Sequence, residues 1–232
     1  MSELATKIEQ VQAVLAEAAR DFSPVTLSNS LGAEDMVLTD LIAKHQPDIE
    51  MFSLDTGRLP QQTYDLMQEV RARYAVPLKI YFPDAQQVED YVAQNGVNGF
   101  YDSVDNRKSC CHIRKVEPLK RALAGKKAWV TGARREQAIT RGALEVSSFD
   151  AVHGIQKFNP LFDWTTGEVW AYLKQHDVPY NKLHDQFYPS IGCAPCTRPV
   201  TPGEDIRSGR WWWENPESKE CGLHVAIPVK RV

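Results

Sequence analysis

Short apolar runs of the kind that form strands alternate with helix-length amphipathic segments along the first half of the chain. The predicted strands span residues 25–30, 50–54, 78–82 and 128–131, and predicted helices between them include 34–45 and 60–74. This alternation is typical of an α/β domain whose mostly parallel sheet is flanked by helices. We also predict an amphipathic helix over residues 2–20, and a capping box at Thr165 and Glu168 predicts a helix that runs to about His176.

The chain changes character after Pro179, where Pro and Gly recur and no helix or strand period persists. With 232 residues and 43% hydrophobic content, the chain can form one domain with a sizeable core and a short extension. We therefore predict one α/β domain over residues 1–200 and an irregular, mobile tail over residues 201–232.

Composition and charge exclude several classes of function. No run of eighteen apolar residues is present and the first ten residues are of mixed charge, so we expect a cytoplasmic protein without membrane association. The net charge of −3 argues against a nucleic-acid-binding protein, so binding of an anion would depend on a local cluster of basic residues. The sequence leaves the oligomeric state open, and a homo-oligomer is compatible with it.

The first predicted strand leads into a turn rich in small and hydroxyl residues, just before a helix. Its candidate ligand-binding residues are Ser28, Ser30, Gly32 and Asp35. Backbone N–H groups and hydroxyls in such a turn can bind an anion, and the helix N-terminus adds a favourable partial charge. A Ser-capped helix start uses the same residue types and is an equally good interpretation.

A second candidate turn, formed by Asp55, Thr56 and Gly57, follows the second predicted strand. Because ligands of parallel sheets bind at the carboxyl ends of the strands, we expect this turn to lie beside the first one and to meet a ribose or base. An ordinary turn would also account for these three residues.

Four of the five cysteines form two close pairs, Cys110 with Cys111 and Cys193 with Cys196. Four thiolates are typical of a zinc or iron–sulfur site. Neighbouring residues on a helix point about 100° apart, which favours a bulky cluster over a single ion. A thioredoxin-like redox pair at 193–196 and two buried thiols at 110–111 are the alternatives. The fifth cysteine, Cys221, lies in the predicted tail, where we expect its thiol to be accessible. A surface cysteine without function is the alternative interpretation.

Basic residues recur near the cysteines and in the tail. Arginine offers bidentate geometry suited to phosphate and sulfate, and nearby cations lower the pKa of a thiol. A solvated surface is the alternative for many of these residues. The candidates for anion binding are Lys115, Arg134, Arg141, Arg207 and Arg210.

Four motifs now stand in order along nearly the whole chain: Ser-x-Ser-x-Gly-x-x-Asp over 28–35, Cys-Cys at 110–111, Cys-x-x-Cys at 193–196, and Glu-Cys-Gly-Leu-His over 220–224. Together they resemble the iron–sulfur-containing, adenylyl-sulfate (APS) reducing branch of the phosphosulfate reductase family. The resemblance implies the adenine-nucleotide α-hydrolase-like (PP-loop) fold, with APS as substrate.

The resemblance also implies a two-step, thioredoxin-dependent reaction in assimilatory sulfate reduction, which leads to cysteine biosynthesis. Cys221 would attack the sulfate sulfur, releasing AMP and leaving an S-sulfocysteine from which thioredoxin releases sulfite. His224 belongs to the same catalytic motif. The resemblance further implies a [4Fe–4S] cluster on Cys110, Cys111, Cys193 and Cys196, a lysine linking cluster and substrate at Lys115, and substrate-gripping arginines at Arg207 and Arg210.

Three alternatives differ in substrate or class. The 3′-phosphorylated nucleotide PAPS is the second substrate within the family, although the four cluster cysteines usually accompany APS preference there. A PP-loop ATP pyrophosphatase would share the fold and the first turn but would not need Cys221. A metal-binding regulatory module would bind the cluster or zinc without turnover.

Overall fold

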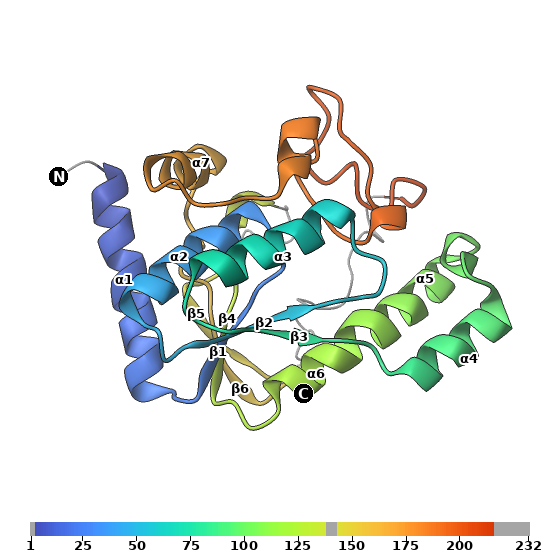
Figure 1. Ribbon diagram of the computed structural model, residues 1–232, viewed down its shortest axis with the longest axis horizontal. Coiled ribbons are helices and arrows are strands. Elements are labelled where there is room, and N and C mark those ends of the chain that lie inside the picture. The colour runs from blue at the N-terminus through green and yellow to red at the C-terminus, as the bar shows by residue number, and fades with distance from the viewer. Residues whose placement is uncertain (1–2, 138–142, 216–232) are drawn as a thin grey trace.

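The computed structural model describes residues 3–137 and 143–215. Its six strands form one sheet in the order β3-β2-β1-β4-β6-β5 (Figure 1). Strands β1 to β4 and β6 run parallel, whereas β5 is antiparallel to β6. The strands are β1 (Val25–Ser28), β2 (Glu50–Leu54), β3 (Leu78–Tyr81), β4 (Ala128–Val130), β5 (Ser147–Asp150) and β6 (Ile155–Phe158). This is the mostly parallel sheet that the alternating pattern predicts.

Helices cover both faces of the sheet. The α-helices are α1 (Glu3–Asp21), α2 (Ala33–His45), α3 (Gln61–Arg73), α4 (Ala85–Asn95), α5 (Val104–Cys111), α6 (Glu117–Leu123) and α7 (Thr166–Gln175). A π-helix, η2 (His112–Val116), joins α5 to α6. None of the described helices combines the length and apolar character needed to span a membrane.

Alternate residues of the strands face two separate cores. Met51 of β2 and Val130 of β4 belong to the large core formed with α1, α2, α3 and α7. Phe52 and Trp129, their neighbours in sequence, pack with Leu119 of α6 on the other face (Figure 1). This is the period-two pattern of strands buried on both faces.

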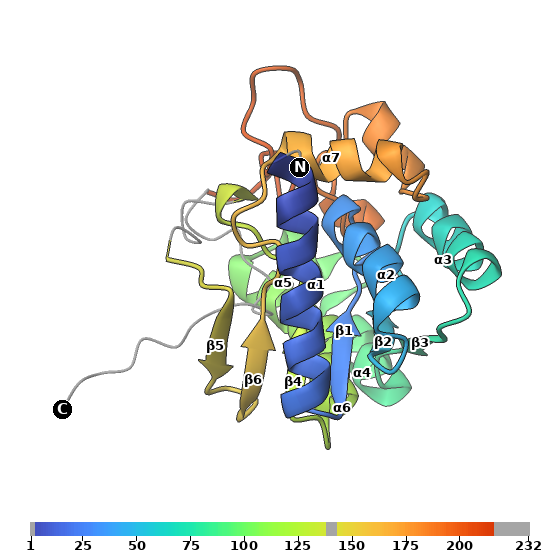
Figure 2. The same ribbon diagram turned by 90° about the vertical axis from the view of Figure 1, so that its left-hand side faces the viewer.

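The strand order reverses at β1. The chain runs outward from β1 to β2 and β3, and then returns to place β4 on the other side of β1. In sheets of this kind ligands bind where the order reverses, at the carboxyl ends of the strands. The irregular segment that follows α7 lies above those ends, as Figure 2 shows for β1 and β6.

Most predicted elements are confirmed within one or two residues, but the β5–β6 hairpin is absent from the sequence prediction. Each of its strands has four residues, which is too short for an alternation of apolar and polar residues to be recognised in the sequence. The hairpin turn is held by the Asp150 carboxylate, which accepts hydrogen bonds from the backbone N–H groups of Val152 and His153. Gly154, at φ of +70°, completes the turn.

Candidate functional site

A cavity of about 710 Å³ lies at the carboxyl ends of β1 and β4, where the strand order reverses. Its walls come from the turn after β1, from residues 131–134 after β4 and from the irregular segment after α7. Eight of the predicted binding and catalytic residues line it, namely Ser28, Ser30, Gly32, Asp35, Lys115, Arg134, Arg207 and Arg210.

The turn after β1 leaves the start of α2 open toward this cavity. Gly32 is the N-cap residue and makes no side-chain cap hydrogen bond. The Ser-capped interpretation is therefore wrong for this helix. Leu31 adopts φ of +62°, and the Asn29 side chain stabilises this shape by accepting a hydrogen bond from Leu31 N at 2.8 Å. The first-turn N–H groups of α2 are thus available to an anion.

Asp35 shapes the turn from inside. It is buried, and one carboxylate oxygen accepts hydrogen bonds from Ser30 N and Ser30 Oγ at 2.7 and 2.6 Å. The other oxygen accepts from Gly132 N at 3.1 Å, which ties the turn after β1 to the end of β4. Any side chain at Gly132 would collide with this carboxylate. A glycine directly after a strand was the sequence signal for that close approach, which our prediction missed.

We expect Asp35 to make stability depend on pH. Burial raises its pKa to about 6, although the hydrogen bonds from Ser30 and Gly132 oppose the shift. A folded-state pKa above the unfolded value means that stability is lost as pH rises through about 6. Between about pH 5 and pH 7.5 the free energy of unfolding of the wild type should therefore fall by about 1 kcal/mol relative to that of Asp35→Asn. Urea unfolding at both pH values measures this difference, with Asp163→Asn as an exposed control. If the free energy of unfolding changed by the same amount between the two pH values in the wild type and in Asp35→Asn, the predicted role of Asp35 would be contradicted.

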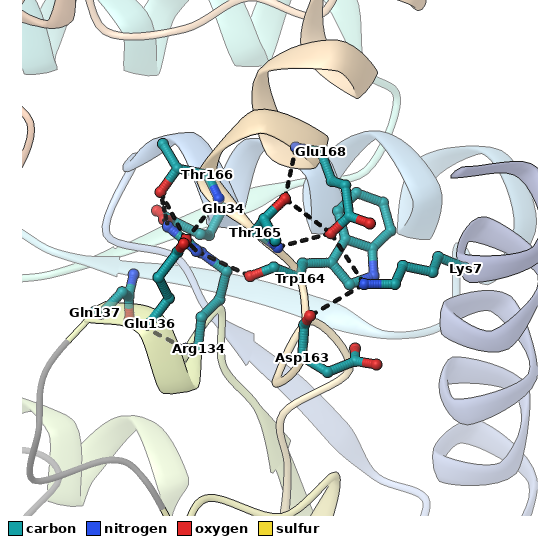
Figure 3. A network of polar contacts seen from close by, with 10 residues as sticks. All are labelled: Lys7, Glu34, Arg134, Glu136, Gln137, Asp163, Trp164, Thr165, Thr166 and Glu168. Carbon is teal, nitrogen blue, oxygen red and sulfur yellow. Dashed lines mark hydrogen bonds and ion pairs between the residues drawn. The ribbon is translucent and has the colours of Figure 1, made fainter. Parts of the chain in front are cut away.

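Arg134 is buried, and two carboxylates compensate its charge (Figure 3). Its guanidinium donates to Glu34 at 2.7 and 2.9 Å and to Glu136 at 2.8 Å. It also donates to the Trp164 carbonyl at 2.9 Å. Arg134 therefore organises the cavity wall between α2 and α7. Its contact with a substrate stays a prediction.

Arg210, from the irregular segment after α7, also lines the cavity and has less compensation. The residue is 8% exposed, and among the described residues its Nη1 makes only long contacts of 3.4 Å, to Ser190 Oγ and the Ile191 carbonyl. Its Nε has no hydrogen-bond partner among the described residues. The guanidinium packs so closely on Gly192 that a side chain there would overlap it. A buried guanidinium with an unused donor on the wall of a cavity is suited to an anionic ligand.

Asp55, Thr56 and Gly57 end β2 as predicted, but they are not among the residues that line the large cavity. The strand order explains this, since the reversal places the cavity between β1 and β4 rather than between β1 and β2. Asp55 accepts hydrogen bonds from Gly57 N and Tyr64 Oη. Thr56 Oγ1 lies 3.3 Å from Cys193 Sγ, so this turn borders the cysteines. Its role in substrate binding stays a prediction.

The two cysteine pairs meet at a second, small cavity. All four thiols line it, together with the side chains of Arg58, Arg107, Arg114 and Lys115. Cys110 and Cys111 come from the end of α5, and Cys193 and Cys196 from a short 3-10 turn. That turn is held to the body by hydrogen bonds from Ala194 N to the Arg58 carbonyl and from Tyr101 Oη to the Pro195 carbonyl. The thiols thus converge from segments about eighty residues apart.

The environment of the thiols fits an iron–sulfur cluster. Within the described ranges, no group of three or more His, Cys, Asp or Glu side chains is arranged to hold a metal ion. The donor set is nevertheless four soft thiols that pack against Phe100 and Trp211, with basic side chains around them. The indole N–H groups of Trp211 and Trp213 are buried there and have no acceptor among the described residues.

The thiols differ in acidity. Burial raises the pKa of Cys196 to about 12, with a further contribution from Cys193 and Cys111, and burial also raises the pKa of Cys110. Burial acts in the same direction on Cys193, but Lys115, together with the contact to Thr56, holds the pKa of that thiol below its usual value. Positive charge is therefore concentrated beside Cys193.

Lys115 is the one residue, within the described ranges, that lines both cavities. It lies four residues after Cys111 in the π-helix η2. A π-turn inserts an extra residue into a helix and so changes the direction of the side chains that follow, and such turns are frequent at functional sites. Lys115 therefore lies between the thiols and the large cavity.

Cys221, His224 and Arg141 lie outside the described residues, so their predicted roles have no structural account here. Of the consecutive tryptophans that precede Cys221, Trp211 is 1% exposed and packs against Phe100 and the cysteines, whereas Trp212 is 40% exposed.

Comparison with known proteins shows the family of the chain. The model of the phosphoadenosine phosphosulfate reductase domain matches residues 24–199. The adenosine 5′-phosphosulfate reductase of Allochromatium vinosum is 54% identical over 91% of this chain and 82% of its own length. The adenosine 5′-phosphosulfate reductase of Burkholderia cepacia is also 54% identical, over 96% of this chain and 89% of its own length.

Among solved structures, the phosphoadenylyl-sulfate reductase of Candida auris in a phosphate complex superposes with a TM-score of 0.71. Its identity is 31%, over 85% of this chain and 98% of its own. The PP-loop fold that the motifs imply is thereby confirmed. The chain belongs to the phosphoadenosine phosphosulfate reductase family of enzymes.

Proposed function

We propose that this enzyme reduces adenosine 5′-phosphosulfate to sulfite and AMP, with thioredoxin as the electron donor. In the first step the Cys221 thiolate attacks the sulfate sulfur, a bond forms between the two sulfur atoms, and the bond from sulfur to the phosphate oxygen breaks. AMP leaves with that electron pair, and Cys221 carries an S-sulfonate. In the second step a thioredoxin thiolate attacks Cys221 Sγ and sulfite leaves. The second thioredoxin thiol then resolves the mixed disulfide, which completes the two-electron reduction.

The position of Lys115 between the two cavities carries this proposal. A ligand with a phosphate and a sulfate needs several cations, and Lys115, Arg207 and Arg210 all line the large cavity. The curated relatives named above share about half of their residues with this chain and bear the name of this activity.

The described residues have separate tasks in the first step. The start of α2, with Ser28 and Ser30, would hold an anionic group of the nucleotide. Lys115, Arg207 and Arg210 would neutralise the oxygens around the reacting sulfur, without which an anionic thiolate could not approach. Asp55, Thr56 and Gly57 do not line the large cavity, but they would support the nucleotide from the carboxyl end of β2.

Cys110, Cys111, Cys193 and Cys196 would hold a [4Fe–4S] cluster, as their convergence at one cavity and their packing against Phe100 and Trp211 support. When bound, the cluster would supply a charged group next to Lys115 that tunes the electrostatics of the substrate cavity. Both sulfur steps are completed by thiols, so no electron needs to pass through it.

The enzyme should form one covalent adduct. Incubation with APS in the absence of thioredoxin should release one AMP per chain and add one sulfonate to Cys221, as peptide mass spectrometry can detect. Thioredoxin should then release sulfite in equal amount. An unmodified Cys221, or a sulfonate on one of the other cysteines, would disprove the mechanism.

The same assay distinguishes the two nucleotide substrates. Because four cluster cysteines accompany APS preference in the family, we expect adduct formation to be faster with APS than with PAPS. A faster reaction with PAPS would reassign the substrate and leave the covalent step standing. We place the enzyme in the cytoplasm, where thioredoxin is reduced, and in sulfate assimilation toward cysteine.

A further inference from the structure

A buried ion pair joins the cysteine helix to the last described part of the chain. Arg107 lies on α5, three residues before Cys110, and is fully buried. Its Nε and Nη2 donate to the two carboxylate oxygens of Glu214 at 2.8 and 2.7 Å. The two side chains are only 1% and 2% exposed. This bidentate pair is separated by 107 positions along the chain, so it fixes the path of the C-terminal segment relative to α5.

Trp211 links this pair to the substrate cavity. The guanidinium carbons of Arg107 and Arg210 lie over its indole ring, at 4.8 and 4.6 Å from the ring centroid. Arg107 also hydrogen-bonds Cys111, so one arginine contacts a thiol, the indole and Glu214. Arg210 in turn lines the large cavity. A displacement of Trp211 would therefore move a cation of that cavity.

Backbone contacts bring the same segment against the second cysteine pair. Trp211 N donates to the Cys196 carbonyl at 3.2 Å, and Glu214 N donates to the Trp211 carbonyl at 2.9 Å. Thr197 and Arg210 form an isolated antiparallel bridge. The segment thus lies against both cysteine pairs. Its backbone contacts Cys196 and Thr197, and Glu214 forms the ion pair with Arg107 of α5.

Loss of the Glu214 carboxylate would release the segment locally. It would remove the bidentate carboxylate acceptor of the buried Arg107 guanidinium, which lies over the same indole ring as a second guanidinium. Breaking a buried ion pair by removing one partner costs far more than the intact pair contributes to stability. Arg107 could reach water at the lowest cost by displacing residues 211–215, since the two sheet cores do not include them and Trp211 packs in a small separate cluster with Phe100, Cys111 and Cys196.

We propose that Arg107 and Glu214 are positioning residues, a clasp that holds the segment carrying Cys221 to the cysteine helix and keeps Arg210 at the substrate cavity. Cys221 follows Glu214 by seven residues, a length that spans at most about 25 Å. The clasp therefore fixes the point from which the chain leads to Cys221, and so limits the distance between Glu214 and that thiol. The part that concerns Cys221 rests on the proposed function, whereas the clasp itself does not.

Limited trypsin digestion of the as-purified protein tests the clasp without any reaction. Glu214→Gln should accelerate cleavage after Arg210 at least tenfold, while cleavage after the buried Arg134 reports opening of the whole domain and should stay unchanged. Glu117→Gln, which breaks the exposed Arg121 pair on α6, is the matched control and should leave both rates as in the wild type. Equal acceleration at both sites, or none at Arg210, would overturn the clasp.

The rate of Cys221 sulfonation tests the positioning role. At saturating APS, Glu214→Gln should lower this rate 10- to 100-fold, and Glu214→Asp, which keeps the carboxylate, should restore part of it. Iron content and visible absorbance should match the wild type, which separates positioning from loss of the cluster. Accelerated cleavage with an unchanged maximal rate of sulfonation would overturn positioning. Absence of sulfonation in the wild type would instead disprove the proposed function and leave the digestion result intact.

Discussion

Cys221→Ser will lower sulfite formation by at least about 1,000-fold. A serine hydroxyl is not ionised at neutral pH and is a weak nucleophile toward sulfur, and even if it reacted it would form a sulfate ester rather than an S-sulfonate. In the second step thioredoxin attacks Cys221 Sγ and sulfite leaves, but in the serine ester an oxygen stands in place of that sulfur, so the second step would be blocked as well. Steady-state sulfite production with excess thioredoxin measures the loss.

The same variant should keep every property that depends on the other four cysteines. AMP should bind with wild-type affinity, and iron content and visible absorbance should be unchanged, because none of the residues that line either cavity is altered. Cys193→Ser is the contrasting variant and should lose iron. If Cys221→Ser also lost its iron, or retained turnover, the division of labour among the five cysteines would be wrong.

The fold could be predicted from the sequence where long amphipathic helices separate buried strands. Strand β2 was predicted with its exact bounds, and the capping box of Thr165 and Glu168 is formed in α7. Prediction failed for short strands that form only by pairing with another strand. An example is β5, which has four residues and pairs with β6 alone. Tertiary pairing, rather than local propensity, determines such strands.

The candidate site could be predicted where function requires particular residue types. Four cysteines and a Ser/Gly turn carry their chemistry in their identity, and the structure brings both groups to neighbouring cavities. The assignment of Asp55 to Gly57 to the same cavity depended on the strand order, which the sequence does not specify. The ion-pair partners of Arg107 and Arg134 could not be predicted either, because Glu214 and Glu34 are about a hundred positions away in the sequence.

Lys115→Ala will lower turnover by about 100-fold without unfolding the protein. Lys115 is the cation shared by the two cavities, and it contributes to the lowered pKa of Cys193. Its loss leaves the sulfate oxygens and the thiol site without a common counter-charge at the moment when a second anion, the Cys221 thiolate, must approach. The defect should appear in the rate of Cys221 sulfonation more than in the affinity for AMP, which has no sulfate.

Lys120→Ala is the matched control, since Lys120 lies one turn further on in α6, is exposed and lines neither cavity. It should have wild-type kinetics. Lys115→Arg should recover part of the lost rate, because it keeps the positive charge but spreads it over a planar guanidinium. A single-turnover comparison of the three variants, with iron content measured on each, decides the outcome. Equal sulfonation rates in Lys115→Ala and Lys120→Ala would mean that the charge between the two cavities does not act on the reacting sulfur, and the link between the thiol site and the chemistry would have to be sought in Arg207 and Arg210.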